Sequence, residues 1–174
     1  MKNVRVKSNR VHHIIWVYIF ILYCYTAVQD VAGIGTIWDM LSYDGISGGI
    51  NFIPFQSEGV TTYILNIIMF MPLGFLLPLI WAEYRSFLKT AIVGLFFSLA
   101  IEICQLFNLR HTDVDDLLMN TLGAMLGYVI WYLFHKVIKQ AGEKAISITK
   151  GGPIIYLALG ILGIFFLYNW RMFV

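Results

Sequence analysis

The sequence predicts an all-α membrane protein, a polytopic bundle of about five transmembrane helices with a partly membrane-embedded first outer loop. Hydrophobic residues make up 59% of the 174 residues and charged residues only 13%, and the mean hydropathy is strongly positive. A soluble domain of this length cannot bury so much apolar surface in one core. Five stretches are also long enough, and poor enough in charge, to cross roughly 30 Å of hydrocarbon.

The five predicted spans share long uninterrupted apolar runs, which favour helices because the strands of a membrane barrel alternate in polarity. They cover residues 11–29, 59–82, 90–109, 117–134 and 151–170. The third span is interrupted only by Glu102. No internal repeat or low-complexity linker divides the chain, so we expect a single domain over residues 1–174.

Charge asymmetry predicts the orientation of the bundle. Ten of the twelve Lys and Arg residues lie before the first span, between the second and third, or between the fourth and fifth. Basic loops stay on the cytoplasmic side of a membrane, which places the N-terminus in the cytoplasm and the C-terminus outside. Seven of the ten acidic residues fall in the opposite, outer segments.

The first outer segment, residues 30–58, is unusually apolar for a loop. It contains Phe52, Ile53 and Phe55 around Pro54. One interpretation is that the loop dips back into the bundle, because a loop with so many apolar side chains is rarely left in water. The alternative is an interfacial anchor that carries no chemistry.

Three polar side chains lie inside predicted spans, where they are costly and usually face the protein interior or a water-filled cavity. Glu102 lies roughly 20 Å along the third span from its inner end, which places it in the outer half. Asn66 and Asn120 reach similar depths in the second and fourth spans. We therefore expect three helices to bring these side chains to one level, with Gln105 and Ser98 one turn from Glu102 on the same face.

The entry to the fourth span extends this polar region. Asp113, Asp116 and Asn120 are spaced i, i+3 and i+7, which is one helical face, whereas Asp115 is expected to point elsewhere. In one interpretation Asp113 is an N-cap and Asp116 completes a favourable first turn. In the other, the face turns inward and joins Glu102 in a pocket open to the outside, with Arg110 as the basic partner or His111 in its place.

Further along the fourth span, Gly123 and Gly127 form a GxxxG pair. Small residues at this spacing let two helix backbones approach closely. We therefore predict a close helix–helix contact at this pair.

At these residues the sequence resembles the VanZ-like family of bacterial membrane proteins. The resemblance is carried by the 51–55 segment, by Asn66 with the 70–74 segment, by Ser98, Glu102 and Gln105, and by a pattern near the fourth span. That pattern, R-x-x-D-x-x-D-x-x-x-N-x-x-G, comprises Arg110, Asp113, Asp116, Asn120 and Gly123. Together these motifs cover about residues 51–128. The resemblance implies a single VanZ-like transmembrane domain in the bacterial plasma membrane and a setting of low-level teicoplanin resistance, but it names no reaction.

The leading functional hypothesis is therefore glycopeptide or lipoglycopeptide resistance, or envelope modulation, through an outward-facing polar pocket. Its partners would be the lipid bilayer and a lipid-linked envelope molecule or a lipoglycopeptide, because apolar walls with a few convergent polar groups suit such a ligand. A net charge of +2 without a basic stripe argues against nucleic acid. The predicted ligand-binding residues are Asn66, Glu102, Gln105, Arg110, Asp113, Asp116 and Asn120.

The alternative is a membrane-embedded enzyme that modifies a lipid-linked envelope substrate. The catalytic candidates are Glu102, Asp113 and Asp116, as general acid or base or as oxygen ligands of a divalent cation. No nucleophile motif or HExxH zinc motif is present, so the sequence assigns no metal site and leaves any cofactor and any reaction open. A transporter ranks last, because the polar side chains stop in the outer half of the spans.

Overall fold

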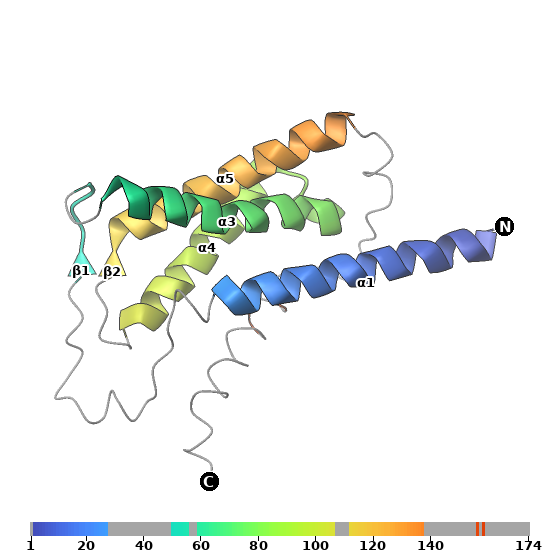
Figure 1. The fold of residues 1–174 in the computed structure, drawn as a ribbon, viewed down its shortest axis with the longest axis horizontal. Helices are drawn as coiled ribbons and strands as arrows, with labels where there is room; N and C mark the ends of the chain where they lie inside the picture. Colours follow the sequence, from blue (N-terminus) through green and yellow to red (C-terminus); the bar gives the residue numbers. More distant parts are fainter. Residues whose placement is uncertain are drawn as a thin grey trace, which may run out of the picture.

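The fold is described from a computed structural model over residues 2–27, 50–55, 59–106 and 112–137, with residues 156 and 158 (Figure 1). Within this part of the chain, the structure consists of helices and one pair of very short strands. In chain order the elements are α1 (Lys2–Ala27), β1 (Ile50–Asn51), α3 (Val60–Ile80), the 3-10 turn η2 (Ala82–Tyr84), α4 (Phe87–Leu106), β2 (Thr112–Asp113) and α5 (Val114–Val137).

Two of these helices, α3 and α5, are long and apolar enough to cross a membrane. At 1.5 Å per residue the 21 residues of α3 extend roughly 31 Å, close to the thickness of the hydrocarbon layer. The first and third predicted spans fall on α1 and α4. The fifth lies outside the described residues except for Tyr156 and Ala158, which are helical. The number of five spans and the embedding of the 30–58 loop therefore stay predictions.

Helices α3 and α5 run side by side in the same direction and pack through glycines (Figure 1). A Cβ at Gly123 would lie 2.3 Å from the carbonyl oxygen of Ile67, and one at Gly127 would lie 2.0 Å from that of Met71. From the other side, a Cβ at Gly74 would lie 1.9 Å from the carbonyl oxygen of Ala124. The close helix contact predicted from the GxxxG pair is confirmed, and α3 is its partner.

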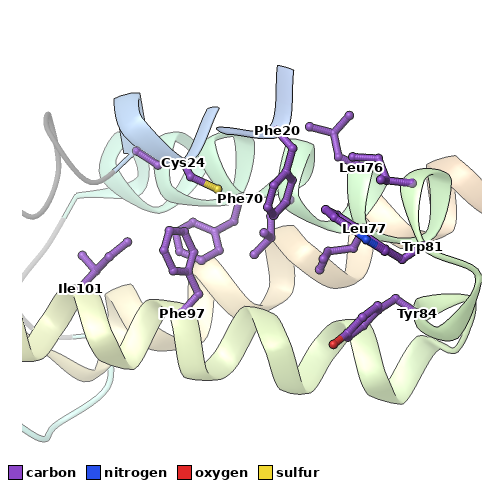
Figure 2. Packing of buried hydrophobic residues seen from close by; sticks show 12 residues of the cluster. Phe20, Cys24, Phe70, Leu76, Leu77, Trp81, Tyr84, Phe97 and Ile101 are labelled. Carbon is purple, nitrogen blue, oxygen red and sulfur yellow. The ribbon is translucent and has the colours of Figure 1, made fainter. Parts of the chain in front are cut away.

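Helices α1 and α4 both run antiparallel to α3 and enclose an apolar core against it (Figure 2). Phe20 of α1 meets Trp81 edge to face at 5.1 Å, and Phe70 of α3 lies 5.6 Å from Phe97 of α4, measured between ring centroids. The hydroxyl of Tyr23 donates to the main-chain carbonyl of Met69 at 3.0 Å, which also ties α1 to α3. These contacts bury aromatic surface from three helices in one place.

The outward faces of the helices are apolar as well. On α3 the exposed side chains include Ile64, Leu65 and Ile68, and on α5 they include Leu118 and Leu122. A protein in water covers most of such surface, whereas a membrane helix presents it to lipid. The exposed residues recur at intervals of three or four, as expected for a helix face in contact with acyl chains.

Strands β1 and β2 pair in parallel at the end of the bundle where α3 and α5 begin (Figure 1). Ile50 pairs with Thr112 and Asn51 with Asp113. The pairing brings together two segments about sixty residues apart and holds the starts of α3 and α5 side by side. We call this the strand end of the bundle.

The opposite end is closed by the turn from α3 to α4. The Arg85 guanidinium donates from Nε to the carbonyl oxygen of Pro78 at 3.3 Å, so it satisfies a carbonyl in the last turn of α3. The same group lies 5.8 Å from the ring centroid of Trp131 on α5. Thr90 donates its hydroxyl to the carbonyl oxygen of Tyr84 at 2.9 Å, which fixes the start of α4.

Candidate functional site

Polar side chains converge at the strand end from α3, α4, α5 and both strands. Six of them are buried although they lie among apolar helices: Ser98, Glu102, Gln105, Asp113, Asp115 and Asn120. We define the polar cluster as these six together with Asn51, Tyr63, Asn66 and Asp116. Because buried polar groups are expensive without partners, their hydrogen bonds indicate what each one does.

Asp113 caps helix α5 and also holds strand β1. Its Oδ1 accepts the main-chain N–H of Asp115 at 3.0 Å, two positions into the helix, which is the geometry of an N-cap. Its Oδ2 accepts from Nδ2 of Asn51 at 3.2 Å. The N-cap interpretation of Asp113 is thus confirmed. The side chain is nevertheless only 5% exposed, so it also belongs to the buried cluster.

Asp115 corrects the sequence prediction, which placed it away from the polar face. It is fully buried, and its carboxylate oxygens accept the main-chain N–H of Phe55 at 2.8 and 2.9 Å. Its Oδ2 also accepts the hydroxyl of Tyr63 at 2.8 Å. The main donor is a backbone group in a loop sixty residues away, and such a partner leaves no pattern in the sequence.

Asn66 of α3 donates from Nδ2 to Oδ1 of Asp116, so this pair bridges the two parallel helices. Both side chains are half-buried. Asn66 therefore meets Asp116 of α5, and the predicted common level of Asn66, Glu102 and Asn120 stays a prediction. Parallel packing of α3 on α5 is what makes the contact possible, because both helices start at the strand end.

Asn120 pairs with α4 instead. Its Nδ2 donates to Oγ of Ser98 at 3.0 Å, and both side chains are buried. Its Oδ1 is buried without a hydrogen-bond partner among the described residues. Ser98 lies one turn from Glu102 on the same face of α4, so this hydrogen bond brings α5 to the polar face of α4.

Glu102 and Gln105 place the last turns of α4 in the cluster. Their side chains are 3% and 6% exposed. The main-chain carbonyl of Glu102 accepts the hydroxyl of Thr112 at 3.1 Å, which connects α4 to β2. The predicted basic partners of Glu102, Arg110 and His111, lie outside the described residues, so that pairing stays a prediction.

The described part of the polar cluster is acidic, with the carboxyl groups of Glu102, Asp113, Asp115 and Asp116 and no basic side chain. Three of these acids stand at the N-terminus of α5, where the helix dipole favours negative charge. No group of three or more His, Cys, Asp and Glu residues in the described ranges is arranged to hold a metal ion. The arrangement can accept hydrogen bonds and attract cationic or donor groups of a ligand.

Three residues that hydrogen-bond to members of the polar cluster were not among the predicted ligand-binding residues. Asn51 and Ser98 carry hydrogen bonds to Asp113 and Asn120. Tyr63 was not singled out at all, although it bonds Asp115. Its position i−3 to Asn66 on α3 was the available signal, since residues at this spacing share a helix face.

Comparison with known proteins identifies a family. The family model described as VanZ/LLP1 matches residues 15–135, a range that contains the whole polar cluster. The chain is 34% identical over 112 residues to Protein VanZ of Enterococcus faecium, an alignment that covers 63% of this chain and 69% of that protein. No solved structure matches the chain.

Proposed function

This chain belongs to the VanZ/LLP1 family, and we propose that it contributes to teicoplanin-type lipoglycopeptide resistance, or modulates the cell envelope, through the polar cluster at the strand end. Family membership, together with two helices that are long and apolar enough to cross a membrane, supports a membrane protein. The ligand would be a lipid-linked envelope molecule or a lipoglycopeptide, whose polar head meets the cluster while its apolar tail meets the helices.

The observation that carries this proposal is the burial of the cluster between three apolar helices. A site of this kind, with few polar groups in apolar surroundings, suits an amphiphilic ligand. Two of its carboxylates, Asp113 and Asp115, already hold backbone groups of the strand end. The functional test is therefore directed at Glu102, which is buried in α4, and at Asp116, which bridges α5 to Asn66 of α3.

The orientation that this function requires has the strand end outside the cell. Basic residues gather at the opposite end of the described structure, in the first turns of α1, in the turn that contains Arg85, and at Lys89 and Lys136. The strand end carries Asp113, Asp115 and Asp116. This segregation supports the proposal, because positive charge is retained on the cytoplasmic side.

The test is the teicoplanin susceptibility of a sensitive bacterium that expresses the protein, with Glu102→Gln and Asp116→Asn variants at equal membrane levels. Both substitutions remove charge and keep the shape of the side chain. The matched control is Glu83→Gln, which makes the same change in η2 at the other end of the bundle. We expect wild type and control to raise the inhibitory concentration, and both cluster variants to return it to the empty-vector value.

Two results would count against the proposal. If both cluster variants protect as well as wild type, the polar cluster is not the functional site. If wild type itself gives no protection, this member does not share the resistance role. The membrane-embedded enzyme with a lipid-linked substrate then becomes the leading hypothesis, and analysis of envelope precursors in the same strains would test it.

A further inference from the structure

Residues 52–55, the described part of the loop that follows β1, display large apolar side chains at the otherwise polar strand end. Phe52 is 75% exposed, Ile53 55% and Phe55 67%. Residues 50–55 contain no charged side chain. Three exposed apolar side chains within four residues form a patch that needs an apolar environment rather than water.

Hydrogen bonds hold residues 52–55 in this conformation. Oδ1 of Asn51 accepts the main-chain N–H of Ile53 at 3.0 Å. Both carboxylate oxygens of the buried Asp115 accept hydrogen bonds from the main-chain N–H of Phe55. Phe55 has a φ of 64°, a left-handed conformation that is uncommon for a bulky residue and persists only where the surroundings impose it. The buried carboxylate supplies that constraint.

The apolar patch continues the exposed apolar face of helix α3. The Phe55 ring stands edge to face against the ring of Tyr63, at 6.1 Å between centroids. The exposed face of α3 starts at Val60, which is 71% exposed, and continues through Ile64 and Ile68. If α3 crosses the membrane, its length matches the hydrocarbon thickness, which would put residues 52–55 at the membrane–water boundary, where aromatic side chains concentrate.

We propose that Phe52, Ile53 and Phe55 form a membrane-docking loop that inserts among the acyl chains of the leaflet at the strand end. In this arrangement Asp115 is a positioning residue, because its hydrogen bonds to the Phe55 N–H fix the backbone conformation of residues 52–55. That conformation directs the three side chains toward lipid. The occupant is bilayer lipid, because the patch is continuous with the lipid-facing surface of α3. Docking would hold the polar cluster at headgroup depth, whatever molecule the cluster recognises.

Spin-label accessibility in liposomes of phosphatidylcholine and phosphatidylglycerol tests this directly. Both cysteines, Cys24 and Cys104, are replaced by alanine in the full-length chain, and a nitroxide is attached at Phe52→Cys. Power saturation then compares collisions with oxygen, which partitions into lipid, and with a water-soluble nickel chelate. The lipid reference is Ile64→Cys on α3, and the reference at the other end of the bundle is the exposed Lys89→Cys.

We expect the label at position 52 to collide more often with oxygen than with the nickel chelate, as we expect for the lipid-facing label at position 64. A nickel accessibility equal to that at position 89 would place the loop in water and overturn the proposal. Exclusion of both probes would also overturn it, because a protein segment or a bound ligand, rather than lipid, would then cover the loop.

The positioning role of Asp115 is tested in the same samples. Asp115→Ala should raise the accessibility of the label at position 52 to the nickel chelate, while the label at position 64 keeps its preference for oxygen. Thr121→Ala on the same helix removes only a hydrogen bond to the main-chain carbonyl of Leu117 within α5, and should leave both labels unchanged. If Asp115→Ala prevents insertion, Asp115→Asn is used instead, with a smaller shift expected in the same direction. An unshifted label at position 52 in an inserted variant would refute the role of Asp115.

Discussion

Substitution of Gly127 by alanine is the sharpest test of the α3–α5 contact on which the polar cluster is built. The added Cβ would lie 2.0 Å from the carbonyl oxygen of Met71 and 3.0 Å from Cα of Gly74. Both obstacles are backbone atoms of α3, so a side-chain rotation cannot relieve the overlap. Since ordinary van der Waals contact begins near 3.4 Å, the helices would have to part by roughly 1 Å or more locally.

The expected magnitude follows from this geometry. Overpacking of a tight interior typically costs about 1–3 kcal/mol, and an obstacle made of backbone belongs at the upper end of that range. Alanine recovers part of the loss through its better helix propensity, by about 1 kcal/mol at most. We therefore expect Gly127→Ala to lower the free energy of unfolding by about 2 kcal/mol, which is roughly a thirtyfold change in the equilibrium.

The assay is reversible unfolding of the purified protein in mixed micelles by increasing SDS, followed by tryptophan fluorescence. The control is Gly59→Ala, where the same methyl group would have no atom within 4 Å. Gly59 caps α3 with a φ of −79°, which alanine can adopt, so a change below about 1 kcal/mol is expected. If Gly127→Ala is as stable as this control, the close approach of the two backbones is wrong.

Two further predictions use the same assay. A double-mutant cycle of Ser98→Ala and Asn120→Ala should give a coupling of about 0.5–1.5 kcal/mol, because their side chains are hydrogen-bonded in a buried place; additive losses would contradict the pairing. Arg85→Ala should lower the free energy of unfolding by about 1 kcal/mol more than Lys89→Ala does. The substitution removes both the contact with the Trp131 ring and the hydrogen bond to the last turn of α3. Equal losses of stability in the two variants would contradict this contribution.

Local pattern was enough to find most of the helices and several residues of the site. The apolar runs around Asn66, Glu102 and Asn120 agree with α3, α4 and α5 to within a few residues, because in lipid the only spanning solution for such a run is a helix. The GxxxG pair likewise predicted a close helix–helix contact, since the absence of a side chain at these two positions is a local property of the sequence. The i, i+3, i+7 spacing marked Asp113 and Asp116 for the same reason.

The partners of those residues could not be read in the same way. The sequence did not indicate that α3, rather than another helix, would receive Gly123 and Gly127. The role of Asp115 depends on the Phe55 amide, and every non-proline residue carries such a group. The pairing of Asn51 with Asp113 depends on a two-residue parallel ladder, which is too short to produce a recognisable strand pattern.

The sequence by itself therefore indicated that the protein is surrounded by lipid and where its apolar helices lie. It also identified the polar residues inside those helices, which need hydrogen-bond partners in the protein. These are properties of single segments, and hydrophobic free energy acts on each segment separately. The tertiary structure decided which helices run together, that Asn66 meets Asp116 while Asn120 meets Ser98, and that Asp115 holds an exposed loop. Those outcomes depend on the packing of surfaces and on directional hydrogen bonds between distant segments, which exist only once the helices are assembled.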